Sequence, residues 1–283
     1  MSAVLPAGYR GLRLLARGRR METWDAYDEA RDARCVVKVL RPERAGEQRV
    51  RDAVLREGEI VTTLAHPHLV RGYAVVEEPL PAVVLETLRG ATLAAVVEDA
   101  ALDLPDVALL GLQLSSVLGW LHRHDWLHLD LKPANVVVEH GKAVLIDLSL
   151  AGRPGPARAG AGTPGYLAPE QARGDHVGPA TDVWALGVTL LESLSGEPPF
   201  GDEATWDSRR RWSTRWSPRW SAAGRRMPSA PRAVPEGLPE ALRGLLLACV
   251  DLDPAARPRL VDVRDVLAGF APRDEDDVGV EAG

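Results

Sequence analysis

A small group of chemically versatile residues lies in the stretch HLDLKPANVVV, residues 128–138. Asp130, Lys132 and Asn135 fall within six positions, and Asn135 is the only asparagine among 283 residues. The chain has three lysines against 31 arginines, so a lysine here indicates a site that arginine cannot fill. Lysine is a compact point charge on a flexible stem, whereas arginine is a broad planar fork. The stretch therefore brings a carboxylate that can accept a proton close to a cation that can bind an anion.

The elements that must hold these residues change in type along the chain. Lys38 lies in an apolar, strand-like run, CVVKVL, and Lys142 lies in a turn, EHGKA, typical of the surface. Short runs bounded by turn residues predict strands at 9–18, 22–30, 34–40 and 81–88, with a helix among them at 46–65. The remainder predicts helices at 92–100, 104–124 and from about 180, a hairpin at 136–148 and a loop at 150–165. A strand-rich first third and a helical remainder indicate two lobes.

Composition and charge narrow the class of protein. The chain is 46% hydrophobic and 26% charged, with a net charge of −6, which argues against a nucleic-acid binder. Cys35 and Cys249 both lie in apolar runs and indicate buried thiols in a reducing compartment. No signal-peptide pattern opens the chain, and no apolar run approaches the ~20 residues that span a bilayer. We expect a cytoplasmic protein without membrane contact.

Six short motifs follow one another in a fixed order: VVKV (36–39), HLDLKPAN (128–135), DLS (147–149), GTPGYLAPE (162–170), DVWALG (182–187) and DPAARP (253–258). In this order they resemble the signature set of Hanks-type, eukaryotic-like bacterial serine/threonine protein kinases. The resemblance implies an α+β, bilobal fold with a small antiparallel β-rich N-lobe, which carries one key helix, and a larger, mainly α-helical C-lobe. It implies a lead-in at 1–8, a kinase domain at 9–270 and a flexible acidic tail at 271–283. Within the domain we expect an N-lobe at 9–86, a C-lobe at 87–270 and an Arg/Trp-rich insert at about 201–235.

The resemblance also assigns roles in phosphoryl transfer from ATP, a reaction that depends on charge neutralisation and orientation of the nucleophile. Lys38, paired with Glu57 and not Glu59, is expected to contact the α- and β-phosphates. Asp147 and Asn135 are expected to hold Mg²⁺ or Mn²⁺, because hard cations prefer oxygen ligands. Asp130 is expected to accept or orient the proton of the substrate hydroxyl. Lys132 is expected to reach the γ-phosphate.

Further positions follow from the same resemblance. Contacts to ATP are expected from Leu15, Ala16, Gly18, Thr23, Val36, Glu86 and Leu88. Four residues are expected to order the catalytic Asp or to support the groove for a protein substrate: Thr163, Glu170, Asp182 and Arg257, with Glu170 paired to Arg257. The Lys two positions after the catalytic Asp follows the Ser/Thr pattern, so the expected reaction is phosphate transfer to Ser or Thr of a protein.

The chain departs from the family pattern at its glycine-rich loop and its regulatory positions. Ala16 and Met21 stand where two glycines are usual, so the backbone loses freedom to approach phosphates. Leu129 replaces the usual Arg before the catalytic Asp, and Ser149 replaces the usual Gly of the DLS turn. An alternative is therefore a pseudokinase or scaffold that binds partners with weak or no turnover. The residues assigned to phosphate, metal and proton are all retained, which favours an active kinase.

The same departures predict that residues 147–170, here called the activation segment, need no phosphorylation. In kinases with Arg before the catalytic Asp, that Arg helps to bind a phosphate on this segment. Leu129 has no charge for such a phosphate. From Asp147 to Gly162 the only hydroxyl belongs to Ser149, and Thr163 is expected to order the catalytic Asp instead.

Two other features allow more than one interpretation. The segment 205–228 is rich in Arg and places Trp212, Trp216 and Trp220 four residues apart, which on a helix makes one aromatic stripe. It is a candidate docking surface for an acidic partner, although the tryptophans could equally pack onto the lobe, and nucleic-acid binding is disfavoured. The second feature, HRHDWLH, has three histidines with metal-like spacing, but one occupies the family's structural position and metal ligation is disfavoured.

Overall fold

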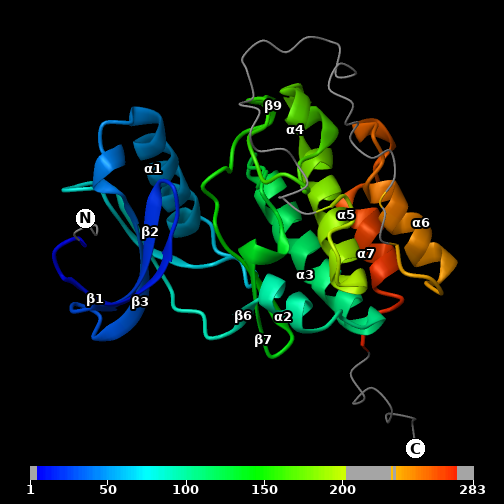
Figure 1. Ribbon diagram of the computed structural model, residues 1–283, viewed down its shortest axis with the longest axis horizontal. Helices are drawn as coiled ribbons and strands as arrows, with labels where there is room; N and C mark the ends of the chain where they lie inside the picture. The colour runs from blue at the N-terminus through cyan, green and yellow to red at the C-terminus, as the bar shows by residue number, and fades with distance from the viewer. Residues whose placement is uncertain (1–4, 202–230, 232–233, 273–283) are drawn as a thin grey trace, which may run out of the picture.

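The computed structural model describes residues 5–201, 231 and 234–272 of the chain. These residues form two lobes that lie side by side, a sheet with one long helix and a larger helical body (Figure 1). The lobe that contains the sheet is built from the first third of the chain. The change from strand to helix patterns near residue 90 thus coincides with the passage of the chain from one lobe to the other.

The N-lobe is a five-stranded antiparallel sheet with the strand order β1-β2-β3-β5-β4. Its strands are β1 (Tyr9–Arg17), β2 (Met21–Asp28), β3 (Ala33–Leu40), β4 (Gly72–Val76) and β5 (Ala82–Leu85). Strand β3 is central, and its buried apolar residues are Cys35, Val37, Val39 and Leu40. Lys38 therefore projects from the best-supported strand of the lobe.

Helix α1 (Gln48–Thr63) packs against the N-lobe sheet next to β4 and β5. Its buried residues share one face of the helix, because they recur at three- and four-residue spacing: Val50, Val54, Glu57, Gly58, Ile60 and Val61. Glu57 lies on this same buried face. The amphipathic pattern thus points a carboxylate inward together with the apolar side chains.

The C-lobe is built mainly from helices. They are α2 (Leu93–Asp99), α3 (Leu104–Arg123), α4 (Pro169–Arg173), α5 (Pro179–Ser195), α6 (Glu240–Cys249) and α7 (Leu260–Leu267). Helix α3 begins at an Asp103 cap, whose Oδ1 accepts a hydrogen bond from Asp106 N at 2.9 Å. Gly111 lets α3 approach its neighbours closely, since a Cβ there would lie 2.5 Å from Leu267 Cδ1 of α7. The packing of α3 against α5 and α7 forms the centre of the lobe.

Short strands in the C-lobe hold the loops that carry the functional residues. Strands β6 (Ala91–Thr92), β7 (Val136–Glu139) and β8 (Lys142–Leu145) form one antiparallel sheet, and β9 (Gly155–Pro156) pairs with β10 (His176–Val177). The predicted hairpin at 136–148 is confirmed, and its turn residues His140 and Gly141 have φ values of 48° and 73°. Two successive left-handed residues are what a tight two-residue hairpin turn requires.

Most predicted elements are present, with several differences. The helix predicted at 46–65 and those at 92–100 and 104–124 correspond to α1, α2 and α3. Strand β4 was not predicted, and the predicted loop at 150–165 contains the two-residue strand β9. Helix α4 begins at Pro169, earlier than the predicted onset of helices near 180. These elements are short and depend on tertiary partners, so local pattern gives them little signal.

Helix α3 also corrects one statement drawn from the sequence. Among the described residues it is the one helix whose length and composition would allow it to cross a membrane. The sequence-based statement that no apolar run approaches that length was therefore wrong. In the fold it is a core helix, in which Val107, Leu114, Val117 and Leu118 are buried. A core helix and a membrane span can share the same apolar composition.

The two cysteines lie in the core of different lobes. Cys35 and Cys249 are both buried and free of any disulfide, as the sequence predicted. Burial raises the pKa of Cys35 to about 11 and that of Cys249 to about 12. Both side chains are therefore neutral thiols near pH 7.

Candidate active site

Lys38 joins the two lobes through a pair of carboxylates. Its Nζ donates to Glu57 Oε1 of α1 at 2.7 Å and to Asp147 Oδ1 of the C-lobe at 2.9 Å. Burial alone would lower the pKa of Lys38, but the two carboxylates raise it above its ordinary value. Burial would likewise raise the pKa of Asp147, yet the Lys38 charge holds it well below its usual range. The predicted partner Glu57, and not Glu59, thus fixes a permanently charged ammonium group at the junction of the lobes.

A second group of side chains surrounds Asp130 on the loop that follows α3. Thr163 Oγ1 donates to Asp130 Oδ1 at 2.7 Å, and Lys132 Nζ donates to Thr163 Oγ1 at 2.6 Å. Lys132 Nζ also lies 3.3 Å from Asp130 Oδ2. The Lys132 ammonium group therefore contacts both the Asp130 carboxylate and the Thr163 hydroxyl. Thr163, from the activation segment, holds the Asp130 carboxylate in one orientation.

The oxygen donors of Asn135 and Asp147 suit a hard divalent cation. Asn135 Nδ2 donates to Asp130 O at 2.8 Å, so its carboxamide oxygen faces away from Asp130. Asp147 has a left-handed backbone, with φ of 61°, and its side chain is 37% exposed. A magnesium ion needs only one or two such protein oxygens, because phosphates and water complete its coordination. The donor set fits Mg²⁺ or Mn²⁺ together with a nucleotide.

Asp182 supports the backbone that precedes Asp130. Its fully buried carboxylate accepts hydrogen bonds from His128 N and Leu129 N, each at 2.9 Å, and from His122 Nε2 at 2.8 Å. Burial opposes ionisation, but these hydrogen bonds hold the pKa of Asp182 below its usual value. A buried charge with three donors is well satisfied, so Asp182 is a rigid anchor for the loop.

Glu170 and Arg257 form a buried pair below the activation segment. Arg257 Nη1 and Nη2 donate to the two Glu170 oxygens at 2.7 and 2.9 Å, and Thr181 Oγ1 donates to Glu170 Oε1 at 2.9 Å. The guanidinium group also lies over the Trp184 ring, 5.1 Å from its centroid. The predicted pairing of Glu170 with Arg257 is therefore present and has the two-pronged geometry of the strongest Arg–carboxylate contacts.

The residues expected around the nucleotide lie on β1, β2, β3 and the connection after β5. Thr23 lies opposite Lys38 in the sheet register, and Val36 lies opposite Leu85 at the end of β5. Leu15 of β1 is 43% exposed. Ala16 pairs with Thr23, and Gly18 N donates to Met21 O at the hairpin turn. A Cβ at Gly18 would make only ordinary contact there, so this turn does not itself demand glycine.

Glu86 and Leu88 follow β5 where the chain leaves the N-lobe. The Glu86 carboxylate accepts a hydrogen bond from Arg71 N at 2.8 Å, and Glu86 N donates to Arg71 O at 2.9 Å. The side chain of Glu86 is thus used within the protein. Leu88 is partly buried against the core.

Two groups of candidate residues remain, the three histidines of HRHDWLH and the three tryptophans of the segment 205–228. His122 contacts Asp182, His124 Nδ1 lies 2.8 Å from Trp120 O, and His128 is fully buried. Within residues 5–201, 231 and 234–272 there is no group of three or more His, Cys, Asp or Glu side chains that could hold a metal ion. The candidate docking residues Trp212, Trp216 and Trp220, and the segment 205–228 around them, lie outside the described residues.

Most of the chain, including both side-chain groups, lies within a match to a known family. A family model described as the protein kinase domain matches residues 9–266. This chain belongs to the protein kinase domain family. The family resemblance and the α+β bilobal fold expected from the sequence are both confirmed.

Kinases of bacteria and of a plant are among the relatives of this protein kinase domain. It is 30% identical over 224 residues to "Serine/threonine-protein kinases PknA" of Corynebacterium glutamicum, and the aligned region covers 72% of this chain and 46% of that protein. It is 36% identical over 188 residues to "Serine/threonine-protein kinase PknB" of Mycobacterium leprae, over 60% of this chain and 30% of the relative. An Arabidopsis thaliana protein named "SNF1-related protein kinase catalytic subunit alpha KIN12" is 32% identical over 71% of this chain and 42% of its own length. The chain thus spans less than half the length of these relatives.

The kinase structure also brings forward contacts that the sequence analysis missed. Gln171, directly after the Glu170 of the GTPGYLAPE motif, is buried and donates to two backbone carbonyls of the active site. Tyr166 donates to Glu192 of α5 at 2.6 Å, and Arg153 Nη1 donates to His124 O at 2.7 Å. Each of these three residues reaches a distant part of the chain, at Leu129, Glu192 or His124. Local pattern carries no signal for such pairs, because each partner alone is typical of the surface.

Proposed function

We propose that this protein is a serine/threonine protein kinase that transfers the γ-phosphate of ATP to Ser or Thr of protein substrates. The observation that carries the proposal is the hydrogen-bonded group of Asp130, Thr163 and Lys132. Asn135 lies on the same loop as Asp130, and Asp147 accepts a hydrogen bond from Lys38. The names of the relatives and the Lys two positions after Asp130 both support Ser or Thr as the acceptor.

The chain's own residues divide the work of phosphoryl transfer. Lys38, fixed by Glu57, offers positive charge to the α- and β-phosphates, and Lys132 offers it to the group in transit. Asp130 accepts or orients the proton of the attacking hydroxyl, with its carboxylate already oriented by Thr163. Bound Mg²⁺ or Mn²⁺, held by Asn135 and Asp147, would supply further neutralisation of phosphate charge.

The experiment that tests this function is incubation of purified protein with labelled ATP, Mg²⁺ and a generic basic protein substrate. We expect label on Ser or Thr of the substrate. We also expect a higher KM for ATP than that of a kinase with a complete glycine-rich loop. The pseudokinase alternative predicts nucleotide or partner binding without transfer. Absence of transfer over a range of Mg²⁺ and Mn²⁺ concentrations would leave only that alternative.

Activity should not require a phosphate on the activation segment. Leu129 is uncharged, the only hydroxyl from Asp147 to Gly162 belongs to Ser149, and Thr163 donates to Asp130. The segment also has contacts independent of any phosphate, because Arg153 donates to His124 O and lies 3.9 Å from the Trp126 ring centroid. Treatment with a broad phosphatase should therefore leave kcat nearly unchanged. A large loss of kcat, traced to a phosphosite within 148–163, would contradict this prediction.

Two finer proposals concern location and partners. A cytoplasmic signalling role agrees with the buried free thiols Cys35 and Cys249 and with the packing of α3 in the core. An acidic partner or substrate is proposed for the segment 205–228 on its sequence, which combines Arg with Trp212, Trp216 and Trp220. Replacing Trp212 and Trp216 by Ala should reduce capture of an acidic peptide without lowering thermal stability. A fall in melting temperature with unchanged capture would assign these tryptophans to packing instead.

A further inference from the structure

The residue before the catalytic Asp130 has a strained backbone that two buried side chains hold in place. Leu129 has φ of 64°, in the left-handed region that costs a non-glycine residue free energy. Its N–H donates to Asp182 Oδ1 at 2.9 Å, and its carbonyl accepts from Gln171 Nε2 at 2.7 Å. Both polar groups of the strained peptide unit are thus fixed. The direction in which the chain enters Asp130 depends on this conformation.

Gln171 connects this strained residue to the activation segment. The same Nε2 that donates to Leu129 O also donates to Ala161 O at 2.7 Å. Because both partners are carbonyls, only the NH₂ group of the amide can face them, and its two hydrogens are both used. Gln171 is 4% exposed, so water does not compete for these hydrogen bonds. One buried amide therefore links the backbone at 129 to the backbone at 161.

The main chain around Gln171 strengthens the same link. Gly160 N donates to Gln171 O at 3.2 Å, one residue from Ala161. Gly162 has φ of 144°, and a Cβ there would lie 3.1 Å from Gln171 Nε2 and 2.5 Å from Leu167 Cδ2. A side chain at 162 would therefore press on the amide. The glycines on each side of Ala161 allow the segment to pass close enough for both hydrogen bonds.

We propose that Gln171 is a positioning residue that aligns Asp130 by clamping Leu129 O and Ala161 O together. The amide does not touch the reacting groups and acts through the backbone that leads into Asp130 and into Thr163. The clamp is uncharged and permanent, so it holds the activation segment on the catalytic loop without a phosphate. This inference rests on the proposed kinase function, and it assigns a role in that function to a residue outside the phosphate, metal and proton set.

The test uses two variants at Gln171 and a matched control on another glutamine. Gln171→Met removes both donors at similar volume, and Gln171→Glu keeps the shape but turns an oxygen toward the two carbonyls. The control is Gln113→Met, because Gln113 also makes two backbone hydrogen bonds, to Gly141 O at 2.8 Å and from Ala143 N at 2.6 Å. Those bonds hold the β7–β8 turn and do not contact the catalytic loop.

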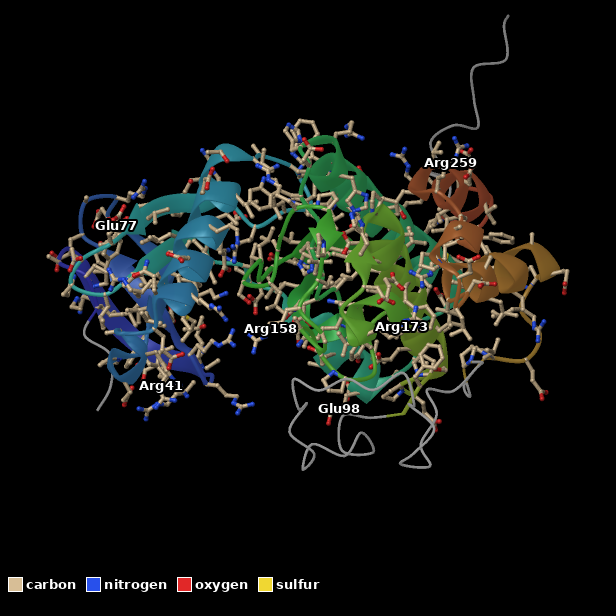
Figure 2. The ribbon with its side chains drawn as sticks, turned by 90° about the horizontal axis from the view of Figure 1, so that it is seen from above. Arg41, Glu77, Glu98, Arg158, Arg173 and Arg259 are labelled. Atoms are coloured by element: carbon tan, nitrogen blue, oxygen red, sulfur yellow. The ribbon has the colours of Figure 1, made fainter. Side chains whose placement is uncertain are left out.

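Two measurements separate positioning from general folding. The first is kcat and KM for ATP, with a generic peptide as acceptor. The second is the rate of trypsin cleavage after Arg158, an exposed residue of the activation segment (Figure 2), followed by mass spectrometry. Loss of one buried hydrogen bond corresponds to about tenfold in rate, so we expect kcat to fall about tenfold or more in both Gln171 variants. KM for ATP should stay within about twofold, because the Lys38 site is not contacted.

The clamp also predicts that cleavage after Arg158 is several-fold faster in the Gln171 variants than in wild type and Gln113→Met. Unchanged kcat and unchanged cleavage in both Gln171 variants would overturn the inference. So would an equal fall of kcat in Gln113→Met, since the effect would then reflect stability alone. If wild type transfers no phosphate, the kinase proposal fails by itself. In that case the cleavage rates still decide whether Gln171 holds the activation segment.

Discussion

Asp130→Asn is expected to lower kcat by about 10²–10⁴-fold, the usual effect of removing a positioned general base. Asn has nearly the shape of Asp, and its amide oxygen can still accept the hydrogen bond that Thr163 Oγ1 donates to Asp130 Oδ1 at 2.7 Å. It cannot take a proton from a substrate hydroxyl, and it loses the attraction to Lys132 Nζ at 3.3 Å. KM for ATP should change little, because the nucleotide contacts expected from β1–β3 are untouched. Phosphate incorporation from labelled ATP provides the measurement.

The matched control for this variant is Asp125→Asn. Asp125 is exposed, lies five residues before Asp130 and has φ of 59°, a conformation that Asn tolerates well. The backbone carbonyl that it offers to Arg153 is unchanged by the substitution. Asp125→Asn should therefore retain wild-type kcat. Equal phosphate incorporation by wild type and Asp130→Asn would refute Asp130 as the base and would favour the pseudokinase alternative.

The parts of the site that the sequence predicts are those whose spacing is fixed by one element. Asp130, Lys132 and Asn135 lie on a single loop, and Glu57 falls on the buried face of α1 together with Val54 and Ile60. The family resemblance selected Glu57 over Glu59, and the helix agrees, because the register that buries Val54 and Ile60 also buries Glu57. The family motifs then supplied the partners of these residues from other parts of the chain.

The parts that the sequence does not predict depend on contacts between distant segments. Gln171 is polar and follows a motif, so nothing in its neighbours indicates that α4 buries it against Leu129 and Ala161. Strand β4 exists because β5 offers it an edge, with Ala74 opposite Val84, and not because of a strong pattern of its own. Such features are set by tertiary packing, which local periodicity does not encode.

The left-handed residues are a third class that sequence identifies only in part. His140 and Gly141 were assigned to a turn from their position between two apolar runs, and their backbone agrees. Leu129 and Asp147 also have positive φ, but a leucine gives no warning of this conformation. The strain at Leu129 becomes understandable only once Asp182 and Gln171 are seen to hold both of its polar groups.

Arg257→Met is expected to lower the free energy of unfolding by about 3–5 kcal/mol, the cost of leaving one member of a buried ion pair alone. The variant leaves Glu170, which is 3% exposed, with Thr181 as its remaining described side-chain partner. It also removes the hydrogen bonds that Arg257 donates to Asp251 O and Ala180 O, and its contact with the Trp184 ring. Chemical denaturation in urea, followed by circular dichroism, measures the change.

Two further variants, together with Glu170→Gln alone, show whether the pair itself is responsible. Arg259 lies two residues away, and its pair with Asp262 is exposed, so Arg259→Ala should leave the denaturation midpoint nearly unchanged. Glu170→Gln combined with Arg257→Met should recover part of the lost stability, because no unpaired charge then remains buried. If Arg257→Met unfolds at the wild-type midpoint, Glu170 and Arg257 do not brace the C-lobe. If the double variant is less stable than Arg257→Met by the full cost of Glu170→Gln, the two residues act independently and the loss arises from the other contacts of Arg257.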